Sequence, residues 1–458
     1  MAEHTMMMEE ALVALLKDKK YFSLRDILST MNPADIAAVF DDLKVERLPL
    51  LFRLLPKELA ADTFVEMEPE AQELLIRGFS DSELREVLDE LYVDDAVDIV
   101  EEMPANVVRR ILAQADPDMR KQINEILRYP EDSAGSIMTT EYVTLRPSMT
   151  VGEAIKRIRR TGIDKETIYT CYVTEDRRLL GLATVKDLLL CEDDNARISE
   201  LMEENVISVG TLEDKEDVAQ MFSKYDFLAL PVVDTEGRMV GIITFDDAMD
   251  VMEEEATEDM EKMAAMLPSE KPYMRSNIFS IWKNRIPWLL LLMVSATFTG
   301  MILNHFEDAL AAQIVLTSFI PMLMDTAGNS GSQTSVTVIR GLSLGEIELG
   351  DLPKILWKEC RVAILCGLTL AVAVYFKILL IDKLLLGGEG ITLPVMLTVC
   401  ITMAATILCA KLVGGTLPIV AERLGFDPAV MASPFITTIV DALALLVYFG
   451  VASLLLHI

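Results

Sequence analysis

Apolar residues change their spacing along this chain, and each spacing predicts a different kind of structure. In residues 6–128, Leu, Ile, Val and Phe recur every three or four positions, as on one face of a helix. A Pro, Ser or Asp near an N-cap marks the helix starts, at Met31-Asn-Pro, Leu55-Pro, Met67-Glu-Pro, Phe79-Ser-Asp and Met103-Pro. Because short helix pairs of this kind stack on their neighbours, we expect residues 1–128 to form an α-helical superhelix.

The next stretch contains an internal duplication. Residues 173–187 align without a gap on residues 233–247, at an offset of 60 positions. Each copy has the pattern of a strand, a tight turn, a second strand and a helix that opens at Thr-x-x-Asp. A further strand and an amphipathic helix precede each copy. The sequence therefore predicts tandem α/β domains of order β-α-β-β-α, at residues 129–199 and 200–258.

A long acidic helix is predicted from residue 246 to residue 285, with a break between Pro268 and Pro272. Several of its acids share a face, and like charges one turn apart destabilise a helix. Two interpretations stay open for this segment. It is either a solvated acidic linker or a surface that divalent cations bridge to other acidic surfaces.

The last part of the chain is apolar. Five segments reach or approach the roughly 20 residues that cross a bilayer, near 286–303, 311–339, 357–380, 391–413 and 429–456. Basic residues gather in the connections on one side, at Lys283, Arg285, Arg340, Lys354, Lys358, Arg361, Lys411 and Arg423. By the positive-inside rule, the N-terminal domains are cytoplasmic and the C-terminus lies outside. We thus expect a multidomain protein with a polytopic α-helical membrane domain at 286–458.

Charge is distributed unevenly between these parts. The net charge is −31, but residues 282–458 hold only 12 acidic and 10 basic residues, so −29 falls on residues 1–281. Such acidity disfavours nucleic acid and favours multivalent cations or basic partners, although it also serves simply to keep a domain dispersed. The six cysteines form no CxxC pair and the three histidines are scattered, which argues against a zinc site.

Candidate chemistry lies in the membrane segments. Asp441 falls inside the last apolar segment, where an isolated carboxylate costs roughly 2.5–3.5 kcal/mol, and no Lys or Arg follows Arg423. A cation or a hydrated pore is the simplest compensation. The second and fifth segments add polar and small residues at similar depth: Asp325, Gly328, Asn329, Gly331, Gln333, Thr437 and Thr438. Oxygen donors suit a hard cation such as Mg²⁺, and a twofold dimer would pair two Asp441 carboxylates.

The duplicated domains resemble a CBS pair, a family of regulatory modules that bind adenosyl nucleotides or ions. In that family the Thr and Asp of the Thr-x-x-Asp element face ribose and phosphate. The resemblance thereby implicates Thr184 and Asp187, with Thr244 and Asp247 in the second copy.

The whole order of domains resembles the MgtE family of magnesium transporters. The motifs Pro-Met-Leu-Met…Gly-Asn-x-Gly-x-Gln, from Pro321, and Asp-Pro-Ala…Ser-Pro-x-x-Thr-Thr-x-x-Asp, from Asp427, carry this resemblance. It implies a homodimeric Mg²⁺ channel in a cell membrane, with Asp441 at the ion site and closure when cytosolic Mg²⁺ is high. The implied sensor ligands are Asp94, Asp98, Asp226, Asp247, Asp250, Glu255, Glu258, Asp259 and Asp427. It also implies ATP near Asp187 as a further ligand, and Mn²⁺, Co²⁺ or Ni²⁺ as other ions.

Two other functions stay open. One is a secondary divalent-cation transporter coupled to H⁺ or Na⁺, which would use Asp441 and Asp325 as a proton relay. The other is a membrane sensor that transports nothing and signals through its CBS pair. An enzyme is least expected, because the sequence offers no nucleophile with a base and no phosphate-binding glycine loop.

Overall fold

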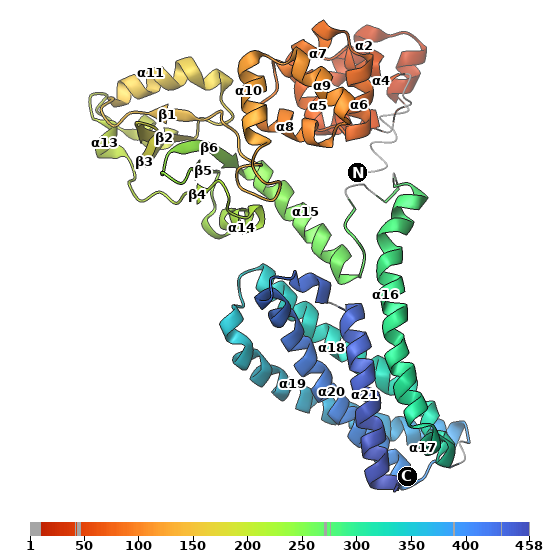
Figure 1. Ribbon diagram of the computed structural model, residues 1–458. Coiled ribbons are helices and arrows are strands. Elements are labelled where there is room, and N and C mark those ends of the chain that lie inside the picture. The colour runs from red at the N-terminus through yellow and green to blue at the C-terminus, as the bar shows by residue number, and fades with distance from the viewer. Residues whose placement is uncertain are drawn as a thin grey trace. The chain divides into compact units, whose positions relative to one another are not determined.

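A computed structural model describes residues 11–41, 43, 47–269, 273–274, 276–387, 390–431 and 433–457, except the side chains of Asp164 and Ser433. The chain divides into two compact units, Met1–Met252 and Glu253–Ile458 (Figure 1). The predicted break at Pro272 and the first residues of the N-terminal domain lie outside the described residues.

The N-terminal part of the first unit is helical, as predicted. Pro33, Pro69 and Asp81 each begin a helix at an expected signal, and Ser80 caps its helix in a capping box with Glu83. Alternate helices pack on one another, α3 on α5, α5 on α7 and α7 on α9. The helices are α2 (Tyr21–Leu28), α3 (Pro33–Asp41), α4 (Leu48–Phe52), α5 (Lys57–Val65), α6 (Pro69–Gly78), α7 (Asp81–Leu88), α8 (Val93–Glu102), α9 (Ala105–Gln114) and α10 (Pro117–Ile126).

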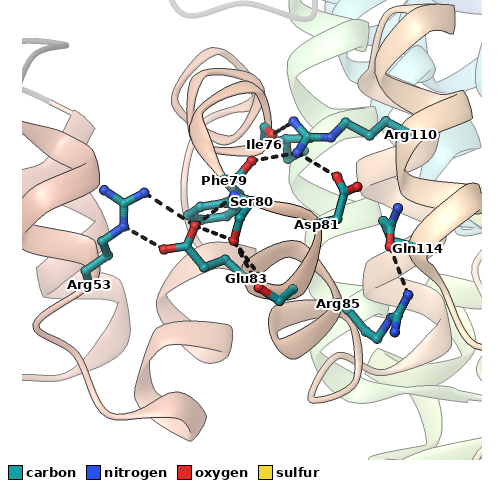
Figure 2. A network of polar contacts seen from close by, with 10 residues as sticks. Arg53, Ile76, Phe79, Ser80, Asp81, Glu83, Arg85, Arg110 and Gln114 are labelled. Carbon is teal, nitrogen blue, oxygen red and sulfur yellow. Dashed lines mark hydrogen bonds and ion pairs between the residues drawn. The ribbon is translucent and has the colours of Figure 1, made fainter.

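Polar contacts join several of these helices (Figure 2). Arg110 on α9 donates from its guanidinium to the carbonyl oxygens of Ile76 and Phe79, at the C-terminal end of α6, the second at 2.6 Å. A cation at this end of a helix satisfies carbonyls that have no partner within the helix. Arg53 in turn binds Glu83 with a 2.7 Å contact. Arg110 therefore joins α9 to the end of α6.

Replacing Arg110 by alanine is expected to destabilise this contact by about 1–3 kcal/mol, because the carbonyl groups of α6 lose a charged donor. Hydrogen–deuterium exchange of the full chain measures the effect as faster exchange in residues 69–78. The exposed neighbour Arg109 provides the control through R109A. Equal protection of α6 in both variants would contradict the role given to Arg110.

Two three-stranded sheets follow, and they confirm the predicted duplication. In each sheet the first strand is parallel to the second and the second antiparallel to the third. The first copy has β1 (Val143–Leu145), α11 (Val151–Thr161), β2 (Thr170–Glu175), β3 (Arg178–Thr184) and α12 (Val185–Leu190). After α13 (Ile198–Leu201), the second has β4 (Val209–Gly210), α14 (Lys215–Tyr225), β5 (Ala229–Val233), β6 (Met239–Thr244) and α15 (Phe245–Met263).

The connecting helix differs from the prediction. α15 ends at Met263, and Ala265 then takes a left-handed conformation with φ of 54° ahead of Pro268. The predicted continuation up to residue 285 belongs largely to the first membrane helix, α16 (Ile278–His305).

The second unit is a helical bundle in which α20 contacts α18, α19 and α21, while α16 packs on α21. Its further elements are α17 (Glu307–Ala312), η2 (Ile314–Phe319), α18 (Ile320–Ser343), η3 (Leu349–Asp351), α19 (Leu352–Lys377), the π-helix η4 (Ile378–Leu385), α20 (Leu393–Arg423), η5 (Pro428–Met431) and α21 (Ser433–Leu456). Lys411, which we expected in a basic connection, lies inside α20 instead.

Four described stretches are long and apolar enough to cross a membrane, at 278–305, 349–385, 393–423 and 428–456. The second predicted segment forms α18, which is not one of them, although it packs against two of them, α20 and α21. The reason is its polar content, which includes Asp325, Asn329 and Gln333. The expected count of five spans therefore stays a prediction.

Candidate ion-binding sites

Asp441 lies in α21, within one of the candidate membrane spans. Its Oδ1 atom is buried and has no hydrogen-bond partner among the described residues. The charge of Asp325, on α18, acts on it. A carboxylate oxygen without a donor in an apolar bundle is costly unless a cation or water compensates it. The predicted ion-site residue thus has an unsatisfied acceptor.

α18 carries a polar stripe that does not face its own bundle. Asp325, Asn329 and Gln333 follow one another at four-residue spacing, which places them on one side of the helix, and all three are exposed. Bare lipid cannot satisfy such groups at membrane depth. If α18 lies in the membrane, this stripe must face water, an ion or another protein surface.

The two glycines of the predicted pore set pack against neighbouring helices. A Cβ atom at Gly328 would lie 2.9 Å from the Cγ2 atom of Thr437, and one at Gly331 would lie 3.2 Å from the carbonyl oxygen of Ala410. A Cβ atom would be too close at Gly328 and unusually tight at Gly331, so these glycines let α18 approach α21 and α20 closely. Their backbone is buried, whereas the stripe on the same helix is exposed.

Thr438 has a partner of its own. Its hydroxyl donates to the carbonyl oxygen of Pro434 at 3.0 Å, one turn earlier in α21. It also lines an apolar hollow of about 600 Å³ between α16 and α21. Among the predicted pore residues, Asn329 and Gln333 offer exposed side-chain oxygens and Asp441 offers a buried one without a described partner.

In the first unit, acids from α8, the first CBS copy and α15 gather within electrostatic range. Asp94 is only 7% exposed, and its charge raises the pKa of Asp247, after the larger effect of burial. Burial and then Asp247 raise the pKa of Asp98 to about 8 and that of Asp95 to about 7. Several carboxyl groups of this cluster therefore repel one another.

The sequence did not point to two members of this cluster, Glu141 and Glu166. Burial and then Asp94 raise the pKa of Glu166 to about 9, and its Oε2 atom is buried without a hydrogen-bond partner among the described residues. Glu141 accepts a bond of 3.2 Å from the backbone N–H of Val93, at the start of α8. Both lie in the first CBS copy, and no local signal in the sequence pairs them with α8.

The remaining predicted sensor residues of the first unit lie elsewhere. Asp226, at the left-handed C-cap of α14, lines a separate hollow of about 470 Å³ with Phe222 and Met249. Asp250 is exposed on α15. Within the described ranges, no three His, Cys, Asp or Glu side chains are grouped so that they could hold a metal ion. The acids share a region, but they do not form a closed chelating set.

In the second unit, three predicted sensor residues meet at the end of α15. The ammonium of Lys262 binds both Glu258, on the same helix, and Asp427, just before η5, the latter at 2.6 Å. Asp259 accepts a hydrogen bond of 3.0 Å from Ser343, at the end of α18. Burial lowers the pKa of Lys262, but the bonds to Asp427 and Glu258 raise it by more. The pKa of Lys262 is therefore above its usual value. Glu255 lies one turn earlier, partly buried.

A tethered cation thus lies between two acids that the family resemblance implies as sensor residues, and no local signal in the sequence indicates it. In K262M, Glu258 and Asp427 would repel each other, so we expect α15 to dock onto η5 and α18 only when Mg²⁺ is added. Hydrogen exchange in residues 255–263, with and without millimolar Mg²⁺, measures this. K262R should keep the Mg²⁺-independent protection, and equal exchange in K262M and the unmodified protein would refute the role of the ammonium.

The predicted nucleotide-binding residues cap helices in both CBS copies. Thr184 and Asp187 form a reciprocal capping box at the start of α12, in which the Asp187 N–H donates to Thr184 Oγ1 at 3.1 Å. Thr244 and Asp247 bond similarly at the start of α15. The Thr-x-x-Asp elements therefore have a structural role of their own.

Family models match almost all of these parts. Residues 31–132 match the MgtE intracellular N domain, residues 134–192 and 198–254 match CBS domains, and residues 320–451 match the divalent cation transporter domain called MgtE. Among solved structures, the cytosolic domain of the Mg²⁺ channel MgtE in complex with ATP is 39% identical, with a TM-score of 0.51, covering 53% of this chain and 99% of that one. The soluble part of a magnesium transporter, 30% identical, also has a TM-score of 0.51, covering 55% and 99%.

Similarity to curated proteins extends over the full length. The magnesium transporter MgtE of Thermus thermophilus is 38% identical, and the alignment covers 95% of both chains. The magnesium transporter MgtE of Bacillus subtilis is 32% identical, with 97% of both chains covered. Identity at this level across every domain confirms the resemblance drawn from the two membrane motifs and the domain order. The chain is a member of the MgtE family of magnesium transporters.

Proposed function

We propose that this protein imports Mg²⁺ across the cell membrane as a homodimer and closes when cytoplasmic Mg²⁺ is high. The observation that carries the proposal is the pairing of Asp441, with its unsatisfied buried oxygen, and the exposed polar stripe Asp325–Asn329–Gln333 on the neighbouring helix α18. Membership of a family whose curated relatives are named magnesium transporters supports Mg²⁺ as the transported ion.

The polar stripe supports a pathway between two copies of the chain. It points away from the bundle to which α18 belongs, so a second copy across a twofold axis would enclose it and bring two Asp441 carboxylates to one path. The two Asp441 carboxylates match the charge of one Mg²⁺, and the Asp325 carboxylates of the stripe add negative charge to the same path. Carboxylate and amide oxygens are hard donors, and a wide, hydrated path suits an ion that gives up its water reluctantly.

The acidic cluster of the first unit supports the sensing role. Its ligands are all carboxylates, which suit Mg²⁺, and no donor among the described residues satisfies the buried Oε2 atom of Glu166. Asp94, Asp98, Asp247 and Glu166 would hold the ion there, and Glu258, Asp259 and Asp427 would do so at the other end of α15. In the first-unit cluster the bound ion supplies the positive charge that the acids lack, and at the end of α15 it adds to the charge that Lys262 already places between Glu258 and Asp427. Asp226, Asp250 and Glu255 join the proposal only through the family resemblance.

ATP at the CBS pair is a second ligand in this proposal, near Thr184 and Asp187. Its support is the solved cytosolic domain of a relative, which was obtained in complex with ATP. Topology completes the proposal: residues 1–285 are cytoplasmic, in keeping with the basic residues at that side, and the C-terminus lies outside.

Mg²⁺ uptake into liposomes, with and without imposed pH and Na⁺ gradients, tests the transport proposal. Uptake driven by the Mg²⁺ gradient and membrane potential alone supports a channel. Uptake that requires a pH or Na⁺ gradient would replace it with coupled transport, in which Asp325 and Asp441 relay protons. Absence of uptake by folded protein at low cytoplasmic Mg²⁺ would refute transport and favour a membrane sensor that transports nothing.

A further inference from the structure

A buried lysine lies within the membrane bundle, where a charge is expensive. Lys411 is inside α20, in the candidate span Leu393–Arg423, and only 5% of it is exposed. A basic residue at this depth normally faces a partner or a functional pathway. The positive-inside rule explains basic residues in the connections between membrane segments. It does not explain Lys411, because Lys411 lies in the interior of a helix. It therefore requires an explanation of its own.

Lys411 joins three helices through one polar cluster. Its Nζ atom donates to Thr334 Oγ1, on α18, at 3.1 Å and lies 3.4 Å from Glu359 Oε2, on α19. The Thr334 hydroxyl donates to the same Glu359 oxygen at 2.9 Å. Thr334 is 2% exposed, and the Glu359 side chain is 16% exposed. The charges of the pair cancel, so the cluster is neutral as a whole.

This cluster lies beside a close backbone contact between α18 and α20. A Cβ atom at Gly414 would overlap the carbonyl oxygen of Gly331, so the two backbones touch at that point. A Cβ atom at Gly415 would contact both Thr334 and Glu359, at 3.6 and 3.9 Å. The small residues let the two backbones touch at this point. The bonds of Lys411 and Glu359 to Thr334 are directional, so they help to hold the rotation of α18, together with the hydrogen bond that Ser335 donates to the carbonyl oxygen of Met431 at 3.3 Å.

Rotation of α18 decides which of its residues lie on the ion path. Thr334 follows Gln333 directly, and consecutive helical residues point about 100° apart. While Thr334 is held toward α19 and α20, Gln333, Asn329 and Asp325 are kept on the exposed side. We infer that Lys411 is a positioning residue, which with Glu359 sets the orientation of the polar stripe on α18 and thereby the discrimination between cations. This inference rests on the proposed Mg²⁺ transport.

The test replaces the ion pair by apolar residues of similar length, K411M/E359M, in liposomes. Removing both partners avoids an unpaired buried charge, which the single variants would create. We expect the ratio of Mg²⁺ uptake to Ca²⁺ uptake to change at least fivefold, while the protein still folds as judged by its thermal unfolding. T334V keeps the ion pair and removes only the hydroxyl, and it should change the ratio of Mg²⁺ uptake to Ca²⁺ uptake in the same direction. If the double variant does not fold, T334V alone tests the positioning role.

A matched control uses a second ion pair of this unit, Lys377 and Asp382, whose contact of 2.8 Å stays within the α19–η4 helix. K377M/D382L should leave the ratio unchanged. An unchanged ratio in K411M/E359M or T334V, with normal Mg²⁺ uptake, would overturn the positioning role and leave the proposed function intact. Absence of Mg²⁺ uptake by the unmodified protein would instead refute the proposed function and this inference together.

Discussion

Replacing Asp441 by asparagine is expected to lower Mg²⁺ uptake at least a hundredfold. Asparagine keeps the size of the side chain but removes its charge, and with it the compensation between the carboxylate and a passing cation. Because each factor of ten corresponds to about 1.4 kcal/mol, a hundredfold loss requires about 2.8 kcal/mol, which is modest for a close charge in a low-dielectric surrounding. Fluorimetric uptake into liposomes at low internal Mg²⁺ measures it.

A control for Asp441 removes an acid that has the same charge but lies outside the proposed path. Asp308, on α17, is exposed, so D308N should transport at close to the unmodified rate. D325N is expected to have an effect between the two, since Asp325 lies on the stripe and its charge acts on Asp441. Full Mg²⁺ uptake by D441N would refute the assignment of the ion site.

Neutralising the acidic cluster of the first unit is expected to weaken closure by Mg²⁺. In D98N, we expect the cytoplasmic Mg²⁺ concentration for half-inhibition to rise at least tenfold, because the ion loses one anionic ligand. Repulsion from Asp247 also falls, so the domain should be more compact than the unmodified one when Mg²⁺ is removed with a chelator. D247N, E255Q and D259N should likewise raise the cytoplasmic Mg²⁺ concentration that gives half-inhibition.

Mg²⁺-dependent protease sensitivity and liposome uptake together measure this response. D35N is the matched control, since it removes the same charge from an exposed position on α3. If the decisive factor were the net charge of −31 rather than the local cluster, D35N and D98N would behave alike. That result would contradict the sensor assignment.

Elements whose ends are marked by residues within the same segment could be predicted from the sequence. Pro33, Pro69 and Asp81 begin helices at the expected positions, because each signal acts on its own segment. The duplication predicted both sheets for the same reason. The early end of α15 at Met263 was missed, since no glycine or proline marks that position.

The site was predictable only where one residue is anomalous by itself. A carboxylate in an apolar segment identifies Asp441 without any knowledge of its neighbours. Glu166, Lys262 and Lys411 were missed because their roles depend on contacts between distant parts of the chain. Lys262 meets Asp427 more than 160 positions away, and Lys411 meets Thr334 77 positions away. Charge patterns along a sequence do not state which opposite charges the fold will bring together.

The most direct test of the central claim is Mg²⁺ uptake by the unmodified protein in liposomes, with Mg²⁺ on the cytoplasmic face varied from none to the millimolar range. The account predicts uptake that is fast when cytoplasmic Mg²⁺ is absent and falls steeply as that concentration rises. Uptake that does not respond to cytoplasmic Mg²⁺, or no uptake at all by folded protein, would contradict a self-limiting magnesium transporter.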